Sequence, residues 1–301
     1  MAWVENKIIT FDALRRYTIY PISDFQLGSE SCDVGLVKRI IKHISKDPYG
    51  MPVILGDLED SDRPTTRAMR RATFADREEV LDADGKQYLY WLDKEVIPLL
   101  LPLAKMPMGI LGILAGHHWK QITSTMNSVE YICNRLKTLS GNNVPYLGQM
   151  SAWIWLRFHG DKSKGFGRQS ITKLLHIQHG EGGGQALGSA LNKLERTAQG
   201  FPADAYVRAH DCRLVSAKTV EVFPKNTEGE PQLACKNIAL LNIGSATRGY
   251  NLTKGRPDYV EQGMMRPLAM GWGELHMDLR RARRSDGDLN DNLMLDFRIE
   301  I

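Results

Sequence analysis

The sequence lacks the long apolar segments of a membrane-spanning protein. A helix that crosses a bilayer needs about 18 or more consecutive apolar residues, and no segment of the 301 residues is that long. The two longest apolar segments, 96–103 and 106–115, are interrupted by Pro102, Lys105 and Pro107. The first residues also lack the apolar core of a signal peptide. We therefore expect no membrane partner.

Cysteine is scarce. The chain has four cysteines, widely and irregularly spaced, and none forms a C-x-x-C pair. This spacing argues against a disulfide framework, so we expect a reducing, cytoplasmic location. We interpret Cys32, Cys133 and Cys235 as small buried residues.

Internal repeats, low-complexity tracts and polar linkers are absent too. Hydrophobic residues make up 43% of the chain and charged residues 25%, as in ordinary globular proteins. The net charge of +4 permits binding to nucleic acid but does not argue strongly for it. Because no linker divides the chain, we expect one domain spanning residues 1–301.

Strand and helix patterns alternate over the first two-thirds of the chain. Apolar runs of four to eight residues predict buried strands, and apolar residues at helical spacing predict amphipathic helices. Residues 61–87 are charged and irregular, which suggests an insertion over the surface. The predicted strands are residues 17–22, 52–55, 109–115, 153–158 and 171–178, and the predicted helices are residues 33–46, 88–101, 128–139 and 185–199.

The chain after Cys212 is rich in predicted strands. They are separated by turn residues, with one clear turn at residues 226–231. This order predicts an α/β (α+β) fold, a mixed-sheet sandwich flanked by helices. The predicted strands of the last third are residues 205–207, 213–215, 219–223, 233–243 and 293–301.

Metal-binding side chains follow five of the predicted strands. Open α/β sheets bind ligands at the carboxyl ends of their strands, so we expect these side chains to meet. Carboxylates with imidazoles suit Zn, Fe or Mn better than Mg or Ca. A pair of such ions would activate a hydroxide and polarise a phosphoryl group. The segments are Asp24-Phe-Gln26, Gly56-Asp57-Leu-Glu-Asp60, Gly116-His117-His118, His179-Gly180 and His210-Asp-Cys212.

This order of segments resembles the signature of calcineurin-like metallophosphoesterases. In that family the motifs run Asp-x-His, Gly-Asp-x-x-Asp, Gly-Asn-His, His-Gly and Gly-His-x-His. The similarity extends from about residue 18 to residue 213. Chain length and the segment from His179 to Gly184 are most similar to members encoded by bacteriophages and prophages, which would place the protein in a host cell's cytoplasm. The resemblance implies a four-layer αββα sandwich of two mixed β-sheets flanked by helices.

The resemblance also implies roles for individual residues. Asp24 matches the first metal-binding Asp, and Asp57 matches the carboxylate that bridges both metals. His117 stands where the family has a ligating Asn. His179 and His210 match two ligands of the second metal.

Two positions depart from the family pattern. Gln26 and Cys212 each stand where the family has a ligating His. A Gln oxygen is a weak ligand, whereas a thiolate favours soft metals such as Zn. We therefore predict one robust site, made of Asp57, His117, His179 and His210. The other, made of Asp24 with Gln26 and Cys212, would be weak, thiol-tuned or empty.

The catalytic residues implied are His118 and Asp60. His118 matches the family's catalytic His, and Asp60 would orient it as a proton donor.

Arg63 and Arg67 are weak candidates for binding a substrate phosphate. The Arg-rich clusters of residues 67–71 and 280–284 are interpreted as solvated surface, with phosphate contacts as the alternative. Glycines 182–184 could approach a phosphate or form a flexible turn.

These residues predict a metal-dependent phosphoric ester hydrolase. It would cleave a mono- or diester by attack of a metal-bound hydroxide, with one or two ions of Mn, Zn, Fe or Ni. We favour nucleic acid or a nucleotide as substrate. The alternative, suggested by Gln26 and Cys212, is an impaired member of the fold that binds nucleic acid or protein. A protein phosphatase is disfavoured because no Asp-Arg-Gly sequence follows Asp60.

Overall fold

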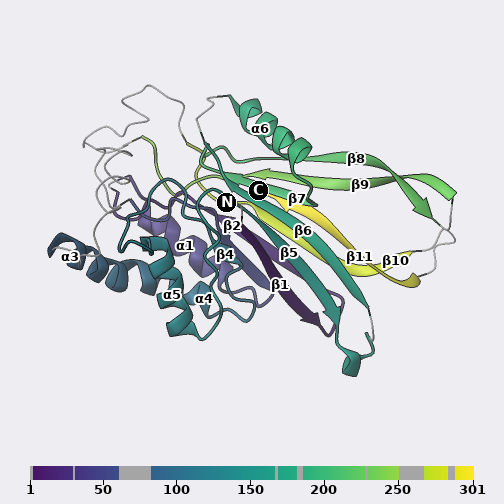
Figure 1. Ribbon diagram of the computed structural model, residues 1–301, viewed down its shortest axis with the longest axis horizontal. Coiled ribbons are helices and arrows are strands. Elements are labelled where there is room, and N and C mark those ends of the chain that lie inside the picture. The colour runs from purple at the N-terminus through teal and green to yellow at the C-terminus, as the bar shows by residue number, and fades with distance from the viewer. Residues whose placement is uncertain are drawn as a thin grey trace.

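The computed structural model describes residues 3–29, 31–60, 83–166, 169–181, 186–227, 230–250, 268–283 and 289–301. They form two mixed β-sheets that pack face to face, with helices on the outer face of each sheet (Figure 1). The predicted fold class, a four-layer αββα sandwich, is confirmed. No helix among these residues is long and apolar enough to cross a membrane.

The larger sheet has six strands in the order β1-β5-β6-β7-β9-β8. Parallel pairs join β1 to β5, β6 to β7 and β7 to β9, while β5–β6 and β8–β9 are antiparallel. Its strands are β1 (Trp3–Phe11), β5 (Ser151–Gly160), β6 (Ser170–His179), β7 (Ala205–Ala209), β8 (Val215–Thr227) and β9 (Glu230–Asn242).

The smaller sheet has five strands in the order β11-β10-β2-β3-β4. β2, β3 and β4 are parallel, and β10 pairs antiparallel with both β2 and β11. Every residue of β3 is buried, as expected for a central strand covered on both faces. The strands are β2 (Arg16–Ile22), β3 (Gly50–Ile54), β4 (Gly112–Ile113), β10 (Glu274–Arg283) and β11 (Leu289–Glu300).

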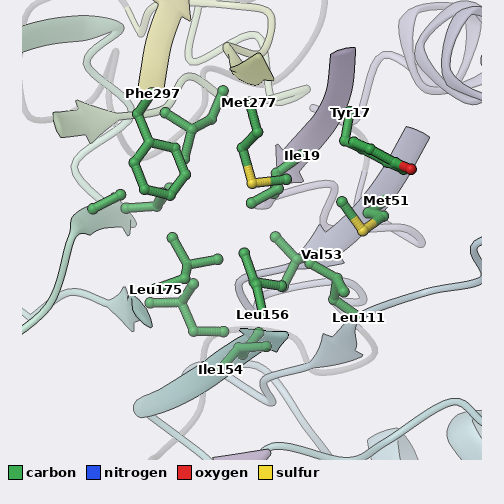
Figure 2. Packing of buried hydrophobic residues seen from close by; sticks show 14 of the residues in the cluster. Tyr17, Ile19, Met51, Val53, Leu111, Ile154, Leu156, Leu175, Met277 and Phe297 are labelled. Atoms are coloured by element: carbon green, nitrogen blue, oxygen red, sulfur yellow. The ribbon is translucent and has the colours of Figure 1, made fainter. Parts of the chain in front are cut away.

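The main core lies between the two sheets. Figure 2 shows Ile19 and Met277 of the smaller sheet facing Leu156 and Leu175 of the larger one. On β5 the buried residues Ala152, Ile154, Leu156 and Phe158 alternate with residues that face outward. This two-residue period fixes which side chains enter the core.

Helices cover the outer face of each sheet. On the smaller sheet lie α1 (Val34–Ile44), α3 (Ala83–Trp91), α4 (Ile97–Ala104) and α5 (Ser128–Ser140), with a π-helical segment at Leu92–Val96. On the larger sheet, α6 (Leu187–Gly200) packs against β7, β8 and β9. A short 3-10 helix, Lys162–Lys164, joins β5 to β6.

Several predicted elements differ from the structure. The strands β1 and β10 were not predicted, and the strand expected at 109–115 is formed only by Gly112–Ile113. The strands expected at 213–215 and 219–223 are one strand, β8, because its long antiparallel pairing with β9 carries it through. The helix expected at 88–101 is three segments from Ala83 to Ala104.

Predictions for the surface have mixed outcomes. Residues 83–87 belong to α3 rather than to an irregular insertion. The rest of the expected insertion, residues 61–82 with Arg63 and Arg67, lies outside the described residues, and so do glycines 182–184. Cys133 is buried as expected, but Cys32 is only partly buried and Cys235 is exposed on β9. Cys235 is exposed because it lies in the far part of the β8–β9 hairpin, where both strands are largely exposed.

Candidate metal centre

The predicted site residues lie on turns at one end of the sandwich. Asp24 and Gln26 follow β2, Asp57 follows β3, and His210 follows β7. Backbone hydrogen bonds tie these turns together, since the Asp24 N–H donates to the Gly56 carbonyl at 3.1 Å and the Gln26 N–H donates to the Asp57 carbonyl at 3.0 Å. The sheet edge therefore holds residues far apart in sequence as one unit.

The backbone at this site adopts an uncommon conformation. Five described residues other than glycine have a positive φ, and all five are predicted site residues: Asp24 (52°), Gln26 (45°), Asp57 (50°), His210 (80°) and Cys212 (47°). Left-handed backbone costs a residue with a Cβ roughly 1–2 kcal/mol. Such conformations concentrate at functional sites, where the surrounding structure imposes them.

Two glycines permit the close approach of the β3 and β4 turns. Gly56 has φ 101° and Gly116 has φ 74°. A Cβ on Gly56 would lie 2.6 Å from the Gly116 Cα, closer than real Cβ atoms come to another atom. Glycine is therefore required at both positions for the Asp57 and His117 turns to touch.

Asp57 is the buried centre of the site. Its Oδ1 accepts hydrogen bonds from the backbone N–H groups of His117 (2.5 Å) and His118 (2.9 Å). Its Oδ2 lies 3.1 Å from His179 Nε2, and 3.8 and 3.9 Å from nitrogens of His118 and His210. Burial opposes ionisation, but the imidazoles of His179, His210 and His118 outweigh it and hold the pKa of Asp57 well below its usual value.

The hydrogen bonds of two imidazoles decide which nitrogen is available to a metal. His179 Nδ1 donates to the Leu55 carbonyl at 2.6 Å, which leaves Nε2 as the ligand atom. That nitrogen is fully buried and, among the described residues, makes no hydrogen bond of good geometry, although Asp57 Oδ2 lies 3.1 Å away. His117 Nε2 donates to the Gly180 carbonyl at 3.0 Å, which leaves Nδ1. Such a bond on the second nitrogen is typical of metal-binding histidines.

The charge distribution of the site favours a cation. Burial lowers the pKa of His117, so its neutral, ligating form dominates. Burial also opposes charge on His179, but Asp57 and Asp24 outweigh it and raise its pKa. Burial raises the pKa of Asp24, and the Asp57 carboxylate adds to that shift. Two buried carboxylates so close together need a compensating positive charge.

The ligand atoms form two overlapping groups, each with all its atoms within 4.8 Å of one another. One consists of His117, His179 and His210, and the other of Asp24, Asp57, His179 and His210. The predicted robust set is thus divided between the groups, and Asp24 joins the carboxylate group. Imidazole with carboxylate oxygen is a donor set that fits a divalent transition metal.

The two residues that depart from the family pattern make other contacts. The Cys212 thiol donates to the His210 carbonyl at 3.4 Å, and among the described residues it belongs to neither ligand group. Burial, together with Asp24, raises the pKa of Cys212 well above its usual value. Gln26 Oε1 lies 3.4 Å from the Thr247 hydroxyl, whose proton is nearer to the Asp24 carbonyl. Their roles as ligands stay predictions.

His118 and Asp60 lie beside the metal ligands, at the open side of the site. His118 Nδ1 is 3.1 Å from Asp60 Oδ1, and 30% of the His118 side chain is exposed. Its Nε2 lies 3.8 Å from Asp57 Oδ2, at the edge of the ligand groups. The pair can therefore reach both a bound ion and a substrate from solvent.

Two residues of the site were not predicted from the sequence. Ser245 and Thr247, after β9, donate hydrogen bonds to the Asp24 carbonyl at 3.2 and 3.0 Å. Both are buried, and they stabilise the left-handed backbone of the Asp24 turn. They follow an apolar strand as the other site residues do, so the same strand-end pattern could have found them.

Comparisons with known proteins give structural similarity only. No protein-family model matches the chain, and no curated protein matches it. The fold is similar to Vps29 from Chaetomium thermophilum (11% identity over 94% of this chain and 96% of that one, TM-score 0.33). It is also similar to a predicted phosphoesterase from Streptococcus pneumoniae (12%, 95% and 100%, 0.30) and to the calcineurin-like phosphoesterase YfkN from Bacillus subtilis (10%, 96% and 91%, 0.34).

Proposed function

We propose that this protein is a metal-dependent hydrolase of phosphate mono- or diesters. The observation that carries the proposal is the buried Asp57 carboxylate, which faces nitrogens of His179, His118 and His210 within 3.9 Å beside a second buried carboxylate, Asp24. A structural polar cluster would not need two ligand groups and an exposed imidazole at their edge.

The chain's own residues prepare the site for this chemistry. A divalent ion held there supplies Lewis acidity and a hydroxide at neutral pH. The N–H groups of His117 and His118 fix Asp57 Oδ1, so that Oδ2 points at the imidazoles. The Leu55 carbonyl fixes the ring of His179 in the same way. The ligands are therefore oriented before an ion binds, which reduces the cost of binding it.

His118 has the position of a proton donor. The Asp60 carboxylate lies 3.1 Å from Nδ1 and fixes the ring, while Nε2 faces the ligand groups. A proton on Nε2 can pass to the oxygen that leaves phosphorus. The exposed part of the ring opens to solvent, which gives room for a substrate.

Finer assignments extend the same proposal. A donor set of imidazoles and carboxylates supports Mn, Zn, Fe or Ni. A nucleic acid or nucleotide substrate, a cytoplasmic location and a relation to phage-encoded proteins are expectations from the sequence. The alternative, suggested by Gln26 and Cys212, is an impaired member of the fold that binds nucleic acid or protein without turnover.

The test combines metal content with hydrolysis. The purified protein should contain a transition metal by elemental mass spectrometry and should hydrolyse an aryl phosphate monoester or a bis-aryl phosphate with added Mn, Zn, Ni or Fe. Asp57→Asn should lower turnover by about 100-fold or more and lower metal content, because it removes the negative charge on which both metal binding and hydrolysis depend. Asp12→Asn, on the surface, is the control.

Three results would contradict the proposal. Absence of both metal and turnover under every condition would exclude the hydrolase. Unchanged turnover in Asp57→Asn would place the activity elsewhere. Bound metal with no turnover on either substrate would favour the binding-only alternative.

A further inference from the structure

The outer face of the six-stranded sheet is only half covered. The helix α6 packs against β7, β8 and β9, whereas β1 and β5 lie at the opposite end of this sheet (Figure 1). On that uncovered end Val4 and Ile8 are each 61% exposed and Trp155 is 37% exposed. These exposures leave ring and aliphatic surface open to a partner.

The strand register places the outward side chains of β1, β5 and β6 in four cross-strand rows, here called the platform. Residues directly opposite one another on neighbouring strands share a face. Alternate residues of β5 are buried in the core, which leaves Trp153, Trp155, Arg157 and His159 pointing outward. The rows are Val4–Trp153–His176, Asn6–Trp155–Leu174, Ile8–Arg157–Thr172 and Thr10–His159–Ser170.

The chemistry of the platform is aromatic and cationic. None of its four rows contains a carboxylate. Arg157 is exposed one row from Trp155, and Lys162 and Lys164 are exposed in the turn where β5 ends. Asn6, Thr10, Thr172 and Ser170 offer hydrogen bonds, and the remaining outward positions are the apolar Val4, Ile8 and Leu174 and the imidazoles His159 and His176. Asp161 lies in the same turn as Lys162 and Lys164, so that turn carries two cations and one carboxylate. With Arg157, the cations near Trp155 outnumber the anion, and an aromatic ring beside an excess of cations complements a polyanion that carries flat bases.

The platform leads to the candidate metal centre. The His179 N–H donates to the carbonyl of Met150, the residue just before β5. His176, the buried member of the first row, on which Phe201 stacks, precedes His179 by three residues on β6, a distance of about 10 Å along a strand. Arg157, Lys162 and Lys164 lie toward the opposite end of β5, so a chain bound along this strand runs from these cations toward the ligand groups.

We propose that the platform binds single-stranded nucleic acid, with bases stacked on Trp155 and phosphates held by Arg157, Lys162 and Lys164. The proposal rests on the proposed function, because it names the substrate class of that site. Bases stack on exposed aromatic rings without sequence preference, and the cations follow the backbone. A protein partner fits less well, since lysine is depleted in protein interfaces.

Binding is measured without metal, so that it does not depend on turnover. Fluorescence anisotropy of a labelled single-stranded oligonucleotide of about 20 nucleotides is followed in chelator at several salt concentrations. Trp155→Ala should weaken binding about 10-fold, because one stacked base is lost. Arg157→Gln should lower the slope of log affinity against log salt by about 0.7, because one phosphate contact is lost.

Matched controls come from the helices that cover the other sheet. Tyr90→Ala removes an aromatic ring that is 64% exposed on α3, and Arg39→Ala removes an exposed cation on α1. Neither should change affinity or its salt dependence. A duplex of the same sequence should bind more weakly than the single strand, since its bases are already stacked.

Three results would overturn the proposal. No binding at low salt would do so, and so would Trp155→Ala binding with wild-type affinity. Light scattering that shows a dimer lost in Trp155→Ala would instead make the platform an interface between copies. Each result is independent of hydrolysis, so the proposed function can fail or hold separately.

Discussion

Each neutral imidazole at the candidate centre can donate one nitrogen lone pair to a metal ion. His179 commits Nδ1 to the Leu55 carbonyl, and His117 commits Nε2 to the Gly180 carbonyl. The two ligand groups nevertheless share His179 and His210. A neutral imidazole cannot bind two ions through one nitrogen. These residues can therefore hold an ion in one of the two ligand groups at a time, but not in both at once.

This residue-scale argument predicts one tightly held ion per chain. Elemental analysis after loading with excess Mn or Zn and gel filtration should give a ratio near one. His179→Ala should reduce the ratio strongly, because both groups lose a member. His117→Asn should keep it, because the group of Asp24, Asp57, His179 and His210 remains.

Two ions per chain that survive gel filtration would contradict the single-ion prediction. In that case Cys212→Ala decides whether the thiol is a ligand of the second ion. A fall from two ions to one in that variant would restore Cys212 to the ligand set.

At the scale of the element, the turns after β3 and β4 are built around a contact that allows no side chain. A Cβ on Gly116 would lie 2.6 Å from the Asp57 backbone nitrogen, and it would also meet Asp57 Oδ1. Gly141, the C-cap of α5, has nearly the same φ, 76° against 74°, but a Cβ there would have nothing within 4 Å. Left-handed backbone is present at both glycines, whereas a Cβ would overlap neighbouring atoms only at Gly116. Comparing alanine substitutions at the two positions therefore separates the two costs.

We expect Gly141→Ala to lower the free energy of unfolding by about 1 kcal/mol, the cost of left-handed backbone alone. Gly116→Ala should cost more, and it should also weaken metal binding about 10-fold or more, because Asp57 must move. Urea unfolding and metal titration measure the two effects. Equal loss of stability and unchanged metal affinity in both variants would show that the turn contact does not position Asp57.

Strands with a continuous apolar run, or with a clear alternation of apolar and polar residues such as β5, were the predictable ones. β2 and β3 are continuous apolar runs, so both were predicted. β1 carries Glu5, Asn6 and Lys7 in its middle, and β10 ends in arginines. On β1 the usual alternation is inverted, because Val4 and Ile8 face outward while Glu5 and Lys7 lie on the side of Ile9 and Phe11, and on β10 the terminal arginines hide it.

At the scale of the whole molecule, the meeting of distant turns was predicted but its detail was not. Strand-end residues pointed to one edge because parallel strands share it. Nothing in the sequence shows that Gln26 and Cys212 adopt left-handed backbone, because neither residue type favours it as glycine does. The division of the ligands into overlapping groups likewise depends on side-chain directions that only the folded chain fixes.

One buried imidazole outside the metal centre joins two layers of the molecule. His176 on β6 is 2% exposed, and its Nδ1 has no hydrogen-bond partner in the part of the chain that the structure describes. Its ring packs against Trp153 of β5, Tyr206 of β7 and Phe201, which follows α6. Burial lowers the pKa of His176 from 6.5 to about 4. The folded state therefore resists a proton that the unfolded chain accepts.

This difference predicts loss of stability in acid. Between pH 6.5 and 4 the unfolded state binds more protons, so stability is intact above pH 6.5 and falls as the pH drops toward 4. A shift of this size corresponds to about 3 kcal/mol once the pH is below both pKa values. Urea unfolding in chelator at pH 7.5 and at pH 4.5, roughly the limits of this window, should show a smaller loss for His176→Phe than for wild type.

Phenylalanine fits the aromatic surroundings of His176 and cannot take a proton, so the comparison isolates this one imidazole from the carboxylates that also titrate in acid. His159→Phe, at an exposed position on β5, is the matched control and should keep the wild-type loss. If His176→Phe lost as much stability as wild type, protonation of this imidazole would not couple to folding. The acid sensitivity of the molecule would then arise from the carboxylates of the candidate metal centre, where the low pKa of Asp57 acts in the same direction.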